Sequence, residues 1–175
     1  MSDTSVERLT KLNSLDLMDL CDALESTMLD TYGFNVGFKQ WAPPLRSELE
    51  AYFNGVMLVP ERKLFVARID GTIGGSLQLV TPHDTHQTTS FSVTLDNHFV
   101  APWARNVGLS RKLLYAAENY AKENDYSQIK FSVRSDREAA ISLYESCKYK
   151  RWGVLPNYEK VANKMFSGYF YVKDL

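Results

Sequence analysis

The chain has 175 residues, of which 45% are hydrophobic and 23% are charged, as in an ordinary folded globular protein. Its net charge of −1 argues against nucleic-acid binding, and no apolar run approaches the roughly 20 residues that a membrane span needs. The two cysteines, Cys21 and Cys147, are too few and too distant in sequence for a disulfide framework or a CxxC zinc site. We therefore expect one cytoplasmic domain over residues 1–175, with no nucleic-acid or membrane partner.

A short strand and two helices are predicted in the first third of the chain. Residues 6–12 alternate weakly, as in a strand. Apolar residues recur at intervals of three and four over 16–32, which predicts an amphipathic helix. A second helix is predicted to open at Pro43 and Pro44, because proline suits the first helical position, and to end at Gly55.

Three antiparallel strands are predicted next. Residues 64–69 are apolar, an Asp-Gly dipeptide typical of hairpin turns follows, and 72–80 is the partner strand. A polar loop leads to the third strand, which alternates within 88–100. His83 and His86 in that loop are spaced like a weak metal pair, but they lack further ligands, so we expect a surface loop and no metal site.

Helices and strands alternate in the second half of the chain. Residues 106–123 carry an apolar stripe of helical period, and 129–133 alternate as a strand. Ser135 and Glu138 form a capping-box pair that predicts the start of a further helix, which carries Cys147 near its end. Each helix connects two strands, which predicts crossovers and some parallel pairing.

The C-terminal part is aromatic and strand-like. Strands are predicted at 149–152 and 169–172, with a loop that contains Pro156 between them. The order of elements therefore predicts an α/β fold, with a central mixed and mostly antiparallel sheet of about six or seven strands flanked by about four helices.

The predicted helix at 106–123 begins with small residues beside positive charges. The first N–H groups of a helix have no partner within the helix, and with the helix dipole they form an anion site. Gly108 lets a ligand reach this backbone, Ser110 adds a hydroxyl donor, and Arg105, Arg111 and Lys112 add positive charge. These residues indicate a phosphate or pyrophosphate site. Two other interpretations stay open: Gly108 could permit close packing of the helix on the sheet, and the basic residues could be a solvated face.

Two segments resemble signatures of the GNAT acetyltransferase superfamily. The segment VAPWARNVGLS at 100–110 resembles the family motif Arg/Gln-x-x-Gly-x-Gly/Ala, which follows a strand and opens a helix. The segment AAISLYESCKYKRWG at 139–153 resembles the second family signature. One helix and one strand separate them, as in the family, and the resemblance covers essentially the whole chain. It implies the GNAT fold, with a sheet splayed at an acetyl-CoA site.

The resemblance also implies where acetyl-CoA binds as the co-substrate. The diphosphate would lie on the backbone N–H groups of 106–111, and the pantetheine arm would run beside the end of the strand at His98 and Val100. Arg137 stands where many members have an asparagine that contacts this arm. The residues expected to bind acetyl-CoA are therefore His98, Val100, Arg105, Asn106, Val107, Gly108, Leu109, Ser110, Arg111 and Arg137.

The strand before this turn carries the candidates for the base. Thr94, Asp96 and His98 are predicted to share one face, because side chains alternate along a strand. Some members of the family have a catalytic glutamate or histidine on this stretch, and Asp96 matches one such position, so we predict that Asp96 acts as the base through water. Alternatively Asp96 binds the substrate's ammonium group or makes a structural hydrogen bond. His98 is the second candidate base, or it packs against the cofactor.

Two tyrosines complete the predicted site. Tyr144 matches the family tyrosine whose hydroxyl approaches the cofactor sulfur, and we predict that it acts there as an acid or orients the sulfur; otherwise it is a core aromatic of its helix. Tyr158 is the candidate for acceptor binding in the aromatic C-terminal part, whereas Tyr169 and Phe170 are expected to pack in the core.

The predicted function is acetyl transfer from acetyl-CoA to a primary amine by direct attack on the thioester. The acceptor is expected to be a small-molecule amine. The alternatives are a GNAT-fold module that binds acyl-CoA without turnover, and an unrelated phosphate-binding α/β protein. Exposed aromatic strands near the C-terminus would also allow a homodimer.

Overall fold

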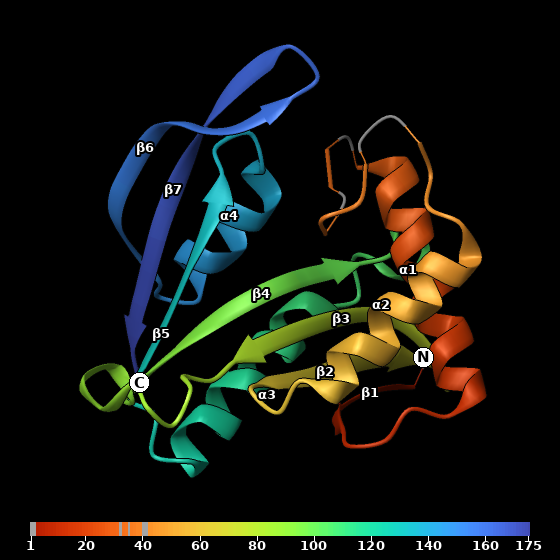
Figure 1. Ribbon diagram of the computed structural model, residues 1–175, viewed down its shortest axis with the longest axis horizontal. Helices are drawn as coiled ribbons and strands as arrows, with labels where there is room; N and C mark the ends of the chain where they lie inside the picture. Colours follow the sequence, from red (N-terminus) through yellow and green to blue (C-terminus); the bar gives the residue numbers. More distant parts are fainter. Residues whose placement is uncertain (1–2, 32, 35, 40–41) are drawn as a thin grey trace.

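The computed structural model describes residues 3–31, 33–34, 36–39 and 42–175 (Figure 1). Within these residues, seven strands form one mixed sheet in the order β1-β2-β3-β4-β5-β7-β6, with four α-helices packed on it. The elements are β1 (Thr4–Leu9), α1 (Ser14–Asp30), α2 (Arg46–Leu58), β2 (Arg62–Ile69), β3 (Thr72–Val80), β4 (Ser92–Val100), α3 (Leu109–Glu123), β5 (Gln128–Arg134), α4 (Glu138–Ser146), β6 (Lys150–Val161) and β7 (Lys164–Asp174). The predicted α/β class, strand number and helix number are confirmed.

Apolar side chains of the helices bury the two faces of the sheet. Figure 1 shows α1 and α2 on one face and α3 on the other. Leu20 and Leu24 of α1 and Phe53 of α2 are fully buried on the first side, and Leu113 of α3 is fully buried on the second. No helix in the described ranges is long and apolar enough to cross a membrane. This packing fixes β2, β3 and β4 as a rigid platform beside the site.

The hairpin between β2 and β3 forms as its turn dipeptide predicts. Asp70 and Gly71 both have positive φ angles, 48° and 89°, as a two-residue hairpin turn requires. Strand β3 has the predicted bounds, Thr72–Val80. Helix α2, however, continues through Gly55 to Leu58, so the prediction that it ends at Gly55 is wrong.

Strands β4 and β5 lie side by side only at their beginnings. They are parallel neighbours, and the register joins Ser92, Val93 and Thr94 to residues 128–130. Beyond Thr94 the two strands diverge, so the sheet opens like a V (Figure 1). Within the described residues, the edge of β4 from Leu95 to Val100 has no strand partner on this side. The predicted splay of the sheet is confirmed, and the opening holds the candidate site.

A β-bulge in β4 corrects one prediction about the site. Asp96 pairs with Gln78 and Phe99 pairs with Ser76, so β4 has one residue more than β3 between these pairs. Asn97 takes a left-handed φ of 45° at the bulge. The alternation of side chains therefore shifts by one, and His98 lies on the face opposite to Asp96. The prediction that Asp96 and His98 share a face is wrong, because simple alternation ignores the bulge.

The second half of the chain departs from two further predictions. Helix α4 begins at Glu138 without a side-chain cap, and the backbone N–H of Ser135 donates to the carbonyl of Ser167 instead of starting the helix. The predicted capping box is therefore wrong. Strand β6 is longer than predicted and contains Pro156. The register with β7 shifts between Leu155 and Glu159, so the missing N–H of Pro156 falls in unpaired backbone and costs no ladder hydrogen bond.

Replacement of Gly168 by alanine is expected to destabilise the β6–β7 hairpin. A Cβ atom at Gly168 would overlap the ring of Tyr158, which packs directly on this glycine. We expect Gly168→Ala to lower the free energy of unfolding by about 1–3 kcal/mol, as other overpacked sites do. Urea unfolding measures this change. The matched control is Gly153→Ala on the same hairpin, where the added Cβ would meet its nearest neighbour at 3.7 Å. Equal stability of the two variants would contradict the prediction.

Candidate active site

The V between β4 and β5 contains a large cleft. Its volume is ≈ 1740 Å³, and it is lined by side chains from both arms of the sheet, from α2 and α4, and from the turn before α3. Small-molecule pockets usually measure about 300–1,000 Å³. The cleft therefore has room for one large ligand together with a second, smaller one.

A turn rich in backbone donors forms one end of the cleft. Asn106 and Gly108 both have positive φ angles, 67° and 80°. The first backbone hydrogen bond of the helix is donated by Lys112 to the carbonyl of Gly108. In the described part of the chain, the six N–H groups of 106–111 donate no hydrogen bond. Six such donors at a helix N-terminus are suited to an anion such as a diphosphate.

The conformation of Gly108 argues against one of the interpretations that the sequence left open. A Cβ atom added at Gly108 would meet no described atom within 4 Å, so close packing of the helix on the sheet does not require glycine. Its φ of 80° does favour glycine, because other residues rarely adopt this conformation. The open space above it exposes the donors to a ligand.

The basic side chains of this turn hold neighbouring elements together. The guanidinium of Arg105 donates to Asp30 at the end of α1, at 2.7 Å, and this hydrogen bond lowers the pKa of the Asp30 carboxyl. Arg111 donates to the hydroxyl of Ser146 at the end of α4, at 2.9 Å. Both arginines also line the cleft, so their charges lie close to the donor turn. Arg137 also lines the cleft, at the start of α4, and burial lowers its pKa.

His98 joins two hydroxyl groups inside the cleft. Its Nδ1 lies 3.1 Å from the hydroxyl oxygen of Tyr144, and its Nε2 lies 2.9 Å from Oγ of Ser110. Burial lowers the pKa of His98 to about 4 and raises the pKa of the Tyr144 hydroxyl above its ordinary value. At neutral pH the imidazole is therefore neutral and the tyrosine keeps its proton. Ser110, which we expected to face a phosphate, turns its hydroxyl towards His98 instead.

Asp96 lies in a polar network on the other face of β4. One carboxylate oxygen accepts a hydrogen bond from Arg62 at 2.8 Å, and the other accepts from the backbone N–H of Asn97 at 3.0 Å. The network continues through buried Gln78, which accepts from Arg62 and donates to the hydroxyl of Tyr52 at 2.9 Å. The sequence pattern identified Asp96 but not these partners, although Gln78 stands out in the sequence as a polar residue within an apolar strand.

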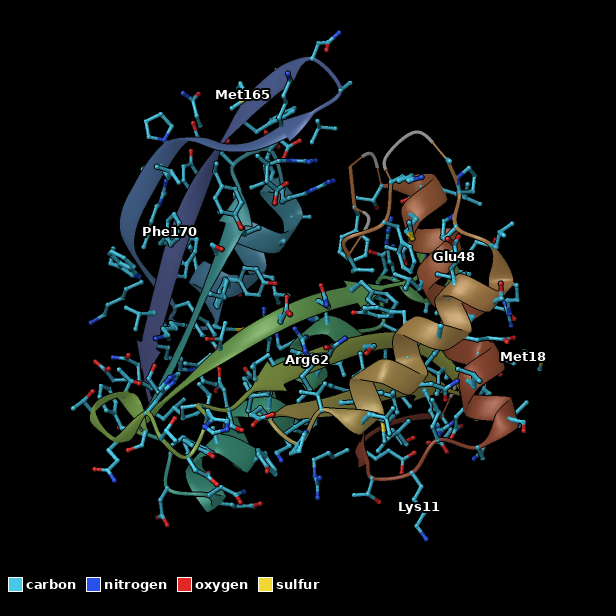
Figure 2. The ribbon with its side chains drawn as sticks, in the orientation of Figure 1. Lys11, Met18, Glu48, Arg62, Met165 and Phe170 are labelled. Atoms are coloured by element: carbon cyan, nitrogen blue, oxygen red, sulfur yellow. The ribbon has the colours of Figure 1, made fainter. Side chains whose placement is uncertain are left out.

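Tyr158 lines the opposite arm of the cleft. Its hydroxyl lies 2.7 Å from Oγ of Ser132 on β5 and forms a hydrogen bond with it. Figure 2 shows Arg62 on the arm that carries β4 and Phe170, which packs on the Tyr158 ring, on the arm that carries β5. The structure therefore brings Tyr158 to the cleft that contains Asp96, from the other side.

The two histidines of the loop before β4 lie apart from this cleft. His83 and His86 are exposed, and the nearest carboxylate oxygen, of Glu61, is 4.0 Å from His83. Among the residues that the structure describes, no group of three or more histidine, cysteine or carboxylate side chains could hold a metal ion.

Comparison with known sequences gives a family match across most of the chain. The model of the acetyltransferase (GNAT) family matches residues 22–149. A protein of Azospirillum brasilense described as an uncharacterized N-acetyltransferase in the hisH-hisA intergenic region is 44% identical over 134 residues, which are 77% of each chain.

Comparison with solved structures gives the same fold. An N-acetyltransferase from Staphylococcus aureus Mu50 matches 99% of both chains with a TM-score of 0.79 and 18% identity. A putative acetyltransferase from Salmonella typhimurium, yncA, solved with its cofactor acetyl-CoA, matches 98% of this chain and 93% of its own, with a TM-score of 0.74 and 15% identity. At these identities the structural matches establish the fold alone.

Proposed function

The chain belongs to the acetyltransferase (GNAT) family and is an N-acetyltransferase, and on this premise we propose that it transfers an acetyl group from acetyl-CoA to a primary amine of a small molecule. The observation that carries the proposal is the cleft itself. It has the donor turn of 106–111 at one end, the hydroxyl of Tyr144 within it, and Asp96 with Arg62 on its wall.

The described backbone fits acetyl-CoA as the co-substrate. The donors of 106–111 would hold the diphosphate, because a helix N-terminus with open N–H groups attracts anions. The open edge of β4 beyond Thr94, which includes His98 and Val100, offers main-chain groups to an extended amide-containing arm. Arg137, just before α4, lines the same cleft, and we assign to its guanidinium a hydrogen bond to this arm.

We assign Asp96 to binding of the acceptor amine. Both of its carboxylate oxygens already accept hydrogen bonds, from Arg62 and from the backbone of Asn97, so its geometry is fixed. A fixed carboxylate orients an ammonium or amino group well. An alkylamine has a pKa of about 10, so one proton must leave before attack, and we assign this proton to water in the cleft.

Tyr144 would supply the proton that the leaving sulfur takes. When the amine nitrogen attacks the thioester carbon, the new C–N bond forms and the C–S bond breaks. The sulfur then takes the proton of the Tyr144 hydroxyl, the nitrogen loses its second proton to water, and the tyrosinate regains a proton from that water. Burial raises the pKa of Tyr144, so the hydroxyl keeps its proton at neutral pH until the leaving sulfur takes it.

A contact across the cleft favours a small acceptor over a protein. A Cβ atom added at Gly33, between α1 and α2, would lie 2.5 Å from Nη1 of Arg134 on β5 and 3.0 Å from Cγ1 of Val161 on β6. The chain between α1 and α2 therefore touches the opposite arm of the V. This contact restricts the space beside the cleft, where a polypeptide acceptor would need to extend and a small amine would not.

Release of CoA thiol in the presence of different amines tests the proposed function. We expect thiol release from acetyl-CoA only when a suitable small amine is present. We expect Asp96→Asn to raise KM for that amine about tenfold, because a neutral amide holds an ammonium group less well, without changing the affinity for acetyl-CoA.

A matched control is Asp136→Asn, which also lines the cleft but forms its ion pair with Arg134. It should leave the amine KM close to that of the wild type. CoA binding without thiol release for any amine would contradict the proposal and indicate a binding module. Faster acetylation of peptides than of small amines would contradict the assigned acceptor class.

A further inference from the structure

We propose that Ser110 and His98 are positioning residues that aim the hydroxyl proton of Tyr144 into the cleft. The inference rests on the proposed role of Tyr144 as the proton donor to sulfur. It adds a function for two side chains, one on α3 and one on β4, that the proposed mechanism uses only through their backbone groups.

The three side chains form a continuous hydrogen-bonded row. Oγ of Ser110 lies 2.9 Å from Nε2 of His98, and Nδ1 of His98 lies 3.1 Å from the hydroxyl oxygen of Tyr144. The bulge at Asn97 makes this row possible, because it turns His98 away from the face of Asp96 and towards α3 and α4. The rings of His98 and Tyr144 pack at 5.8 Å between centroids, which restricts both.

The neutral state of His98 restricts the hydrogen bonds that the row can contain. A neutral imidazole has one N–H donor and one acceptor nitrogen. If Nε2 accepts from the Ser110 hydroxyl, then Nδ1 carries the proton and donates to the Tyr144 oxygen. Tyr144 has a single hydroxyl proton, and in this arrangement that proton is not used by His98. This hydroxyl proton can therefore point at the thioester sulfur.

The opposite arrangement would remove the donor. If Nε2 donated to Ser110, then Tyr144 would donate its only proton to Nδ1 and would present no proton to the cleft. A serine at position 110 permits the productive arrangement, because its hydroxyl can donate to Nε2. In that arrangement Nδ1–H also stabilises the oxygen of Tyr144 while its proton moves to sulfur, so the effect falls on the chemical step.

Steady-state kinetics of three variants test this assignment. We expect Ser110→Ala to lower kcat by about tenfold, because the variant loses one hydrogen bond. The KM for acetyl-CoA should not change, because the backbone N–H of residue 110 remains. We expect Ser110→Thr, which keeps the hydroxyl, to restore most of kcat. In a Tyr144→Phe background, Ser110→Ala should cause no further loss of kcat, because residue 144 then has no hydroxyl proton to orient.

A second substitution and a control separate this role from a structural one. His98→Asn places an amide N–H near the position of Nδ1 and should retain more activity than His98→Leu. Ser90→Ala, at an exposed serine whose hydroxyl donates to the carbonyl of Gln87 in its own turn, should have the wild-type kcat.

Three outcomes would overturn the inference. The first is an Ser110→Ala enzyme with raised KM for acetyl-CoA and normal kcat, which would assign the hydroxyl to the phosphate. The second is an equal loss of kcat on Ser110→Ala with and without the Tyr144 hydroxyl. The third is a normal kcat in Tyr144→Phe, which would remove the proposed donor itself and is therefore distinct from a failure of Ser110 and His98 alone.

Discussion

Replacement of Tyr144 by phenylalanine is expected to lower kcat by about 100-fold, the lower end of the range for general acid catalysis. The substitution removes only the hydroxyl that lies 3.1 Å from His98. The ring stays in the aromatic cluster, where it packs against Phe131 at 4.3 Å between centroids, so the fold should persist. Thiol release at saturating acetyl-CoA and amine measures kcat, and titration of the cofactor should give an unchanged dissociation constant.

The neighbouring Tyr149 offers a matched control. Its ring lies 6.1 Å from that of Tyr144 in the same cluster, and it is also buried. It is not among the residues that line the cleft. Tyr149→Phe should therefore keep the wild-type kcat. A loss of kcat in both variants alike would indicate a packing effect and would contradict the role of the Tyr144 hydroxyl.

Replacement of Gly108 by valine is expected to weaken acetyl-CoA binding by about 100-fold. The added side chain would occupy the open space above the N–H donors of 106–111 and would block the diphosphate. A loss of several charge-assisted hydrogen bonds, each about 1.5–3 kcal/mol, is enough for this effect. Isothermal titration with acetyl-CoA measures it directly.

The hairpin turn provides a control for backbone strain. Gly71 has a φ of 89°, close to that of Gly108, and an added Cβ there would also meet nothing within 4 Å. Valine at either site should cost a similar free energy of unfolding, roughly 1–3 kcal/mol, because both residues would be held in the left-handed region. Only Gly108→Val should lose affinity for the cofactor. Normal affinity in that variant would show that the diphosphate does not lie on this turn.

Local signals in the sequence were enough for the elements and for the donor turn. The Asp-Gly dipeptide placed the hairpin between β2 and β3, and the small residues before α3 marked an exposed helix start. These features depend on the conformation of a few neighbouring residues, so sequence patterns can predict them. The capping-box pattern at Ser135 failed, because a backbone hydrogen bond to Ser167 on β7 holds that residue outside the helix.

The details of the site depend on contacts between distant parts of the chain. The bulge at Asn97 leaves no clear pattern in the sequence, and it reverses the side to which His98 points. The ion pair of Asp96 with Arg62 joins residues from β4 and β2. Ser110, His98 and Tyr144 come from three different elements, and only the packed fold brings their polar atoms together. Residue identities could be proposed from the sequence, but their hydrogen-bond partners could not.

The divergence of β4 from β5 would link the stability of the folded state to the binding of acetyl-CoA. Without a ligand, β4 beyond Thr94 keeps a row of main-chain amides and carbonyls that face no neighbouring strand among the described residues, and the carbonyl of Val100 in this row accepts from Arg105. If acetyl-CoA completes this row, its concentration enters the folding equilibrium, and at a hundred times the dissociation constant it adds about 2.7 kcal/mol to the native state. The resistance of the protein to heat and proteolysis would then rise and fall with the acetyl-CoA supply.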